Sequence, residues 1–322
     1  MSGWNLRVAA GALAAAMGFA SAAQAQTIRP LRIVSQFATG SVSDLTLRVV
    51  GERLGTRLKT SVVIENMPTG GGVAAALAVI NAPADGNTLA LLSNATAVSV
   101  VSFKNLPFDP VRDFVPVAGI SQFAYIFLVN EKSGLRSLRD FVAAARAKPG
   151  ALNVGTAAPG TTPYLIAQLV KKEANIDFTM IPYRGATDLT VALLRNDIDV
   201  FINAYGAVKE NLRQKQMRAI ASTAAERFKL LPDVPTVQEE GVRGFEATSW
   251  NGLFAPAGTP AAVVGGIGGQ LRASLAEPEV ARKLVDLGVE VWASDAPQLA
   301  ARMRAEIERW RGVVQEAAIE RN

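Results

Sequence analysis

Residues 31–57 read LRIVSQFATGSVSDLTLRVVGERLGTR, and this stretch decides the fold class. Residues 31–37 form a short run rich in apolar and β-branched side chains, which predicts a strand. Residues 38–43 are small and polar, which is typical of a loop. From residue 44 to residue 57, apolar side chains recur at helical spacing. The stretch therefore predicts a strand, a loop and a helix in succession.

The same order of elements recurs along the chain. The apolar segment 115–129 is divided by Ser121-Gln122, which indicates two runs. Alternating strands and helices predict an α/β fold whose sheets are largely parallel. In such sheets, ligands bind at the carboxyl ends of the strands, where loops lead into helices. Further strands are predicted at residues 61–65, 88–92, 152–155, 178–183, 199–203 and 219–223, and further helices at 73–80, 138–147, 163–173 and 187–195.

Four segments at predicted strand ends are rich in glycine, serine, threonine and asparagine. Small residues let the backbone approach a ligand, and the free N–H groups at a helix start point toward an anion. One helix start contributes about 0.3–2 kcal/mol, so a micromolar Kd, about −8 kcal/mol, needs several loops on one ligand. A single loop of this kind is an ordinary connection between a strand and a helix, whereas four such loops indicate an anion site. The segments are residues 38–43, 68–72, 93–96 and 155–162.

The chain has 322 residues and contains neither histidine nor cysteine. Its length suits about two domains. The missing residue types exclude Ser-His-Asp and Cys-His catalysis, HExxH zinc sites, CxxC redox chemistry and disulfide bonds. Carboxylate, hydroxyl or lysine chemistry and binding without chemistry remain. We expect no catalytic residue, no metal and no cofactor.

The formal net charge is +5, but basic residues are interleaved with acidic ones. The basic-aromatic pattern of single-strand binders is missing, so nucleic acid is not an expected partner. The densest basic stretch, residues 209–218, predicts a solvated helical face, with docking of a partner as the alternative. In the helical pattern 306–316, Glu306 and Glu308 follow Arg302 and Arg304 by four residues. This spacing predicts surface ion pairs rather than the paired carboxylates of a glycosidase.

One motif is a false lead. Residues 70–75 fit the pattern GxGxxA of a dinucleotide-binding turn after a strand. The acid that should end the following strand is missing, because residues 88–92 lead into Ser93-Asn94. We therefore expect no NAD site.

The N-terminus predicts export. Residues 1–25 carry Arg7 as their only charged side chain, followed by an apolar run from Val8 to Ala20 and the sequence Ala-Gln-Ala at 23–25. This pattern is typical of a secretory signal peptide cleaved after Ala25. The run is too short for a membrane-spanning helix of about 20 residues. We expect an exported protein in the periplasm.

Several motifs, in order along the chain, give it a family resemblance. The chain resembles the Bug family of periplasmic solute receptors, the binding components of tripartite tricarboxylate transporters. The resemblance covers nearly the whole sequence after residue 25. It is carried by GSVSD (40–44), ENMPTGGG (65–72), DGNTL (85–89), FDPVRDFVPV (108–117), AKPGALN (147–153), PYRG (182–185), LPDVPT (231–236) and WNGLFAPAGTP (250–260).

The resemblance implies a two-lobed, class II periplasmic-binding-protein fold with a ligand cleft between the lobes. We expect the first lobe to comprise residues 26–121 and 250–322, and the second to comprise 122–249, with crossings near 121–125 and 245–250. Closure on a small carboxylate would follow from contacts with both lobes. The expected ligand-binding residues are Gly40, Ser41, Ser43, Asp44, Thr69, Gly70, Gly71, Ser93, Asn94, Thr96, Thr156, Ala157, Gly160, Thr161, Thr162, Arg184 and Asn203.

Two of these residues have alternative interpretations. Arg184 adjoins a strand end and could hold a carboxylate through two hydrogen bonds; alternatively it pairs with Asp188 on the surface. Asp44 is interpreted as a helix-start acid that orients loop amides or a water. Where this family often has an aspartate in a later loop, this chain has Asn203, which favours a carboxylate without an α-amine.

Three functions from different classes stay open. A solute receptor that delivers its ligand to membrane permease subunits is favoured. A receptor that presents its ligand to an exported sensor domain is the second, and a carboxylate-dependent exported hydrolase is the third. We expect a monomer.

Overall fold

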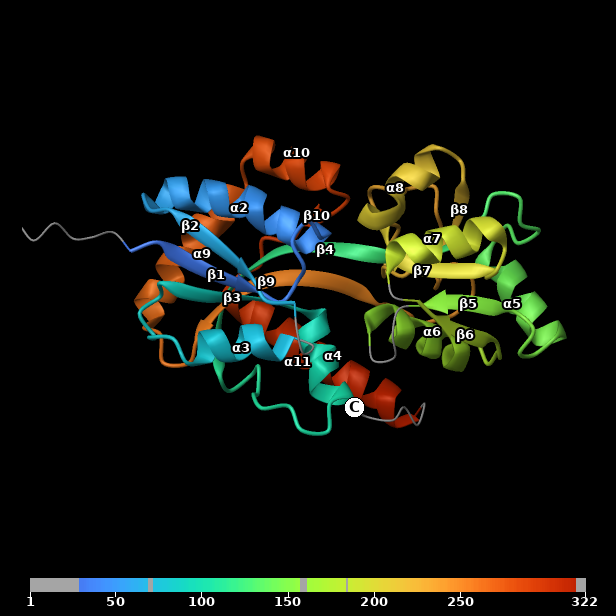
Figure 1. The fold of residues 1–322 in the computed structure, drawn as a ribbon, viewed down its shortest axis with the longest axis horizontal. Helices are drawn as coiled ribbons and strands as arrows, with labels where there is room; N and C mark the ends of the chain where they lie inside the picture. The colour runs from blue at the N-terminus through green and yellow to red at the C-terminus, as the bar shows by residue number, and fades with distance from the viewer. Residues whose placement is uncertain (1–28, 69–71, 157–160, 184, 317–322) are drawn as a thin grey trace, which may run out of the picture.

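The computed structural model describes residues 29–68, 72–156, 161–183 and 185–316. Within these residues, ten strands form one mixed sheet with helices on both faces (Figure 1), which confirms the predicted α/β class. The strands are β1 (Leu31–Ser35), β2 (Val62–Asn66), β3 (Thr88–Ser93), β4 (Phe114–Asn130), β5 (Asn153–Thr156), β6 (Thr179–Pro182), β7 (Val200–Ala204), β8 (Met217–Ser222), β9 (Thr248–Pro256) and β10 (Glu290–Val291). The helices are α2 (Val42–Leu58), α3 (Val73–Ile80), α4 (Asn94–Ser102), α5 (Leu138–Ala147), α6 (Thr162–Glu173), α7 (Ala186–Arg195), α8 (Tyr205–Arg213), α9 (Ala261–Leu275), α10 (Pro278–Asp286) and α11 (Ala296–Glu316).

The sheet extends through two lobes. In the first lobe, β1 pairs in parallel with β2 and β3, and β3 pairs antiparallel with β9. In the second lobe, β5 pairs in parallel with β6 and β7. The strand order is β2-β1-β3-β9-β4-β7-β5-β6, and both β8 and β10 pair with β4. The two parallel groups lie at opposite ends of the molecule in Figure 1, as a two-lobed fold requires.

Strand β4 runs from one lobe into the other. Up to Ala124 it pairs with β9, and from Tyr125 it pairs with β7. The prediction of two apolar runs divided at Ser121-Gln122 is wrong, because β4 is one strand of 17 residues. Its polar interruption is accommodated, since the Asn251 Nδ2 donates a hydrogen bond to the Ser121 hydroxyl at 3.2 Å. A buried polar group with a partner does not end a strand.

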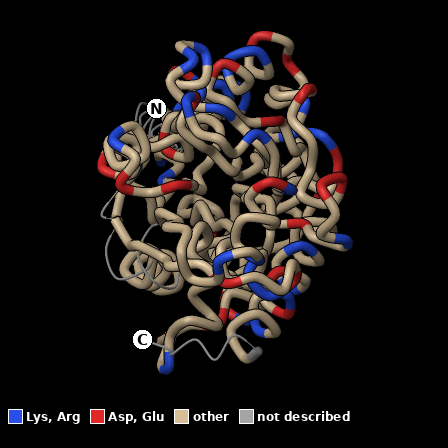
Figure 2. The backbone as a smooth tube through the Cα atoms, turned by 90° about the vertical axis from the view of Figure 1, so that its right-hand side faces the viewer, with Lys and Arg blue, Asp and Glu red and all other residues tan. Residues whose placement is uncertain are grey.

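Helices cover both faces of the first lobe. In the view of Figure 1, α2 and α10 lie above its strands and α3, α4 and α11 lie below them. Trp250, Trp310, Phe127 and Phe141 are among the largest side chains that are fully buried. Burying a large apolar side chain contributes about 1.5–3 kcal/mol, so these rings stabilise the core strongly. Figure 2 shows basic and acidic positions interspersed along the backbone, as the sequence predicts.

Two predictions about charged helical faces are wrong. Residues 209–218 do not form one helical face, because α8 ends at Arg213 and Lys215 takes a left-handed φ of 53° before β8 begins. The predicted pair of Arg302 with Glu306 forms, but it is not a surface pair, since Glu306 is only 4% exposed. Glu306 accepts a hydrogen bond from the Trp310 Nε1 at 2.8 Å and lies 3.3 Å from the Arg302 Nε. Helix α11 packs against β4, α4 and α6 at once, which buries residues outside its apolar stripe.

Candidate functional site: helix N-termini between the lobes

Helix N-termini from the two lobes meet between them. Helices α2, α3 and α4 follow β1, β2 and β3, and α6, α7 and α8 follow β5, β6 and β7. The Asn94 Nδ2 at the start of α4 donates a hydrogen bond to the Thr162 Oγ1 at the start of α6, at 2.9 Å. A Cβ at Gly206 in α8 would lie 3.1 Å from the side chain of Val42 in α2. Two opposed pairs of helix N-termini therefore bracket the interlobe region.

The Gly40 loop leads from β1 into α2. Gly40 takes a φ of +81°, in the left-handed region that favours glycine. The Ser41 hydroxyl accepts a hydrogen bond from the Asp44 N–H at 3.2 Å and caps α2. Ser43 is buried at the same helix start. The structure thus brings together four of the predicted site residues.

Asp44 holds this loop in place. Its fully buried carboxylate accepts hydrogen bonds from the Gly40 N–H at 2.8 Å, the Arg48 Nε at 3.0 Å and the Asn66 Nδ2 at 2.9 Å. Burial opposes ionisation, but the hydrogen bonds from Arg48, Gly40 and Asn66 outweigh it and lower the pKa of Asp44. Both carboxylate oxygens are engaged by protein groups, which agrees with the interpretation that Asp44 orients loop amides.

The start of α4 differs from its prediction. Residues 93–96 were predicted to be a loop, which is wrong, because α4 begins directly at Asn94. The Ser93 hydroxyl accepts from the Ala95 N–H at 3.1 Å, and the Thr96 hydroxyl accepts from the Ser93 N–H at 3.3 Å. This capping box lets the helix start at the strand end, so that no loop is needed.

Gln36 was missed by the sequence analysis. Its Nε2 donates hydrogen bonds to the Ser93 Oγ at 3.2 Å and the Thr96 Oγ1 at 3.0 Å, so it ties the Gly40 loop to α4. Gly72 takes a left-handed φ of +91° at the start of α3, which favours glycine, and a Cβ there would lie 2.0 Å from the Gln36 Oε1, so a side chain would displace Gln36. The predicted strand 31–37 placed Gln36 inside it, whereas β1 ends at Ser35 and leaves Gln36 at the strand end that faces the site.

A buried polar cluster joins the lobes at the crossing strands. The Ser249 hydroxyl of β9 donates a hydrogen bond to the Asn94 Oδ1, whose amide also reaches Thr162. The Tyr125 hydroxyl of β4 belongs to the same cluster. Burial raises the pKa of Tyr125, although hydrogen bonds with Thr162, Ser249 and Asn94 partly oppose the shift. Asn94 and Thr162 were predicted at the site, whereas Tyr125 and Ser249 were not.

Three further predicted residues lie in the second lobe. Thr156 ends β5 fully buried, and its hydroxyl has no hydrogen-bond partner among the described residues. Thr161 is the N-cap residue of α6. Asn203 lies near the end of β7, where its Oδ1 accepts from the Ala204 N–H at 2.8 Å. The predicted residues Thr69, Gly70, Gly71, Ala157, Gly160 and Arg184 lie outside the described residues.

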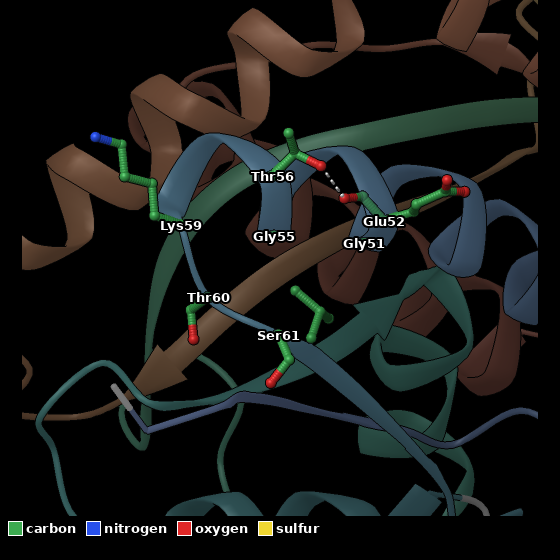
Figure 3. Close-up of a pocket in the computed structure, with 8 residues that line it drawn as sticks. Gly51, Glu52, Gly55, Thr56, Lys59, Thr60 and Ser61 are labelled. Atoms are coloured by element: carbon green, nitrogen blue, oxygen red, sulfur yellow. Dashed lines mark hydrogen bonds between the residues drawn. The ribbon is translucent and has the colours of Figure 1, made fainter. Parts of the chain in front are cut away.

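A depression of about 520 Å³ lies on the first lobe along α2 and β2 (Figure 3). The dashed line in Figure 3 joins the Thr56 Oγ1 to the Glu52 carbonyl oxygen at 3.1 Å, and the Lys59 side chain extends away from the strands. A Cβ at Gly55 would lie 2.7 Å from the Thr60 carbonyl oxygen, so glycine lets α2 approach β2 closely. The depression follows from this packing. Across the described segments, no group of three or more acidic side chains could hold a metal ion.

The fold and the opposed helix N-termini define the class of protein: a two-lobed periplasmic binding protein. Rpa4515 of R. palustris, solved with adipate, is 29% identical with a TM-score of 0.81, over 92% of this chain and 99% of that one. MatC of Rhodopseudomonas palustris, solved with bound malate, is 30% identical with a TM-score of 0.77, over 89% and 99%. Of the helices that the structure describes, none has the length and apolar character to cross a bilayer.

Sequence relatives agree with the structural ones. A UPF0065 protein from the tcbD–tcbE intergenic region of Pseudomonas sp. strain P51 is 31% identical over 296 residues, which are 91% of this chain and 88% of the relative. Protein BugT of Bordetella pertussis is 29% identical over 310 residues, 95% of both chains. The family model for the tripartite tricarboxylate transporter family receptor matches residues 46–319. The chain belongs to this family of periplasmic receptors, which confirms the predicted resemblance.

Proposed function

We propose that this receptor captures a small carboxylate between its lobes, closes on it, and presents it to the membrane subunits of a tripartite transporter. The observation that carries the proposal is the opposition of helix N-termini, α4 to α6 and α2 to α8. The positive ends of the helix dipoles and the free N–H groups there favour an anion. A carboxylate that contacts both lobes binds the closed arrangement better than the open one, and this difference drives closure.

The ligand class follows from the same site. Malate and adipate, with which two structural relatives were solved, are dicarboxylates without an amino group. Asn203 adds no negative charge at the end of β7, so it offers little to an ammonium group and does not repel a carboxylate. We infer a carboxylate without an α-amine as the ligand.

The remaining parts of the proposal concern the chain as a whole. We infer that a signal peptide is removed after Ala25. We infer that residues 26–121 and 250–322 form the first lobe and residues 122–249 the second, because β4 and β9 cross near these limits. The protein acts by binding and not by catalysis, which is supported by its membership in a family of receptors and by the engagement of Asp44 with protein donors.

A thermal-shift screen of the exported protein tests this function. The panel contains mono-, di- and tricarboxylates, amino acids and aromatic acids. A ligand at 100 times its Kd stabilises the native state by about 2.7 kcal/mol, so a true ligand raises Tm clearly. We expect a dicarboxylate to raise Tm and its α-amino analogue to raise it less. If no carboxylate raises Tm, the proposal is wrong.

A further inference from the structure

We propose that the segment between α10 and β10 is a second contact between the lobes, beside the α8 end of the ligand site, and that it sets how tightly the receptor holds its ligand. We call residues 286–290 the α10–β10 turn. It lies within residues 250–322, which we assign to the first lobe, and β10 pairs with β4 at Ser121 and Gln122, where β4 crosses between the lobes. The inference rests on the proposed closure of the lobes.

The backbones of the two lobes touch at two glycines. A Cβ at Gly288 in the turn would lie 2.7 Å from the Cα of Gly206 in α8. A Cβ at Gly206 would lie 2.6 Å from the Leu287 carbonyl oxygen. Real Cβ atoms do not approach other backbone atoms this closely, so both positions must lack a side chain for the lobes to meet here. Gly288 also takes a φ of +80°, whereas Gly206 is in an ordinary helix and its glycine is explained by close packing against the turn and against Val42 of α2.

A lysine reinforces this contact from α8. The Lys209 Nζ donates a hydrogen bond to the carbonyl oxygen of Asp286, the last residue of α10. The final carbonyl groups of a helix have no partner within the helix and carry the negative end of its dipole. A cation from the opposite lobe therefore satisfies a group that α10 cannot satisfy itself. This also gives Lys209 a role, because the sequence pattern had placed it on a solvated face.

One carboxylate of the turn contacts the second lobe and the crossing strand. The Glu290 Oε1 accepts a hydrogen bond from the Lys229 N–H of the second lobe at 3.1 Å. Its Oε2 accepts from the Gln122 Nε2 of β4 at 3.4 Å. The α10–β10 turn thus contacts the second lobe at three points: the side chain of Lys209, the helix backbone at Gly206 and the N–H group of Lys229. All three contacts lie apart from the opposed termini of α4 and α6. The Lys209 and Glu290 contacts also do not involve Val42 of α2, whereas Gly206 adjoins both the turn and Val42.

Contacts that exist only when the lobes are closed change affinity without touching the ligand. The apparent Kd equals the intrinsic Kd divided by the fraction of protein in the binding-competent arrangement. Removing a closure contact lowers that fraction and weakens binding, while the ligand's own hydrogen bonds stay the same. Gly206 and Lys209 are therefore positioning residues for ligand capture.

The test uses two variants, each with a matched control. Gly206→Ala places a methyl group against the Leu287 carbonyl and, at 3.1 Å, against Val42 of α2, and its control is Gly266→Ala in α9, where an added Cβ meets no atom within 4 Å. Lys209→Ala is the variant that changes the turn contact without crowding Val42. Lys209→Ala removes the bond to α10, and its control is Lys132→Ala, an exposed lysine of the second lobe. With adipate as the probe, we expect the Kd to rise more than tenfold for Gly206→Ala and about threefold to tenfold for Lys209→Ala, which loses one charge-assisted, partly solvated hydrogen bond. The controls should stay within twofold.

A distance measurement gives a second readout that needs no ligand. Because the chain has no cysteine, spin labels can be attached through Val63→Cys in the first lobe and Val191→Cys in the second, both exposed. We expect adipate to shift the wild-type distances toward a single closed population, and Gly206→Ala to deplete that population with and without adipate.

Unchanged Kd values for Gly206→Ala and Lys209→Ala, with adipate still bound by the wild type, would overturn this inference and leave the proposed function intact. If the wild type binds no carboxylate, the proposed function is wrong. If the label distances are identical in Gly206→Ala and wild type, the proposed role of the α10–β10 turn in closure is wrong, whatever the ligand. A ligand-free Gly206→Ala protein that does not fold also overturns it, since the contact would then belong to every state.

Discussion

Replacement of Asp44 by asparagine should loosen the Gly40 loop and destabilise the protein. The buried carboxylate receives three hydrogen bonds, from Gly40, Arg48 and Asn66, and an amide in its place points a donor at one of these donors. Hydrogen bonds to a charged group contribute about 1.5–3 kcal/mol. The ion pair with Arg48 contributes little to this free energy, because the Arg48 side chain is 46% exposed and its charge is screened by solvent. We therefore expect Asp44→Asn to lower the free energy of unfolding by about 1.5–3 kcal/mol.

The assay is thermal unfolding at neutral pH. One kcal/mol shifts Tm by about 2–4 °C in a domain of 150–250 residues, so a loss of about 3–12 °C is expected. The matched control is Glu279→Gln, which removes an i,i+4 ion pair with Lys283 whose glutamate is 67% exposed. Surface changes of this kind stay within about 0.5 kcal/mol. Equal Tm values for Asp44→Asn and Glu279→Gln would refute the reasoning. Adipate binding should weaken in Asp44→Asn alone, because only there is the Gly40 amide released.

The pH dependence of this difference has a definite sign. Because the folded-state pKa of Asp44 is lowered, its stabilisation is fully present above the unfolded value of about 3.9. It is lost as the pH falls through the lowered folded-state pKa. The Tm difference between wild type and Asp44→Asn should therefore be constant from about pH 5 upward and shrink in stronger acid.

Three further outcomes are expected. Thr162→Val leaves the buried Asn94 amide without its acceptor and should cost about 1–3 kcal/mol, measured as a fall in Tm against Thr56→Val on the exposed face of α2. Burial raises the pKa of Glu306, so wild type should lose stability relative to Glu306→Gln as the pH rises above about 4 and through the raised folded-state pKa, the opposite direction to Asp44; a constant Tm difference would contradict this. Adipate affinity, measured by calorimetry, should change less than about twofold between about pH 6 and pH 8, because the chain has no histidine; a tenfold change would show a titrating group at the site.

The order of elements could be predicted because it depends on local signals. The spacing of apolar residues and the Gly- or Ser-rich loops indicated the strand-to-helix units. The helices at residues 73–80 and 138–147 were predicted with the bounds that the structure has. The start of α4 was missed because serine and threonine favour loops and helix caps alike. Only the pairing of Ser93 with Thr96 distinguishes the two, and that spacing was not used.

The candidate site was harder to predict because its partners come from different elements. Asn94 and Thr162 were both predicted as ligand contacts, yet nothing in the sequence shows that they bond to each other. Tyr125 and Ser249 lie within strands, where their direction depends on the register between β4 and β9. Gly206 lies inside a helix, where glycine has no local role, and only the tertiary structure explains it.

An uncompensated carboxylate beside the proposed anion site would repel an anion. Asp44 avoids this conflict, because Arg48 and two uncharged donors already compensate its charge. A carboxylate is also the only side chain that can accept all of these bonds at once, since each of its oxygens has two acceptor positions. Its lowered pKa keeps it ionised, so the Gly40 loop stays organised throughout the neutral range. The loop can then offer its remaining backbone N–H groups to a ligand without any residue of the Gly40 loop or α2 start changing charge on binding. We therefore propose that Asp44 serves anion recognition by ordering the backbone of the Gly40 loop, with its own charge held by protein donors.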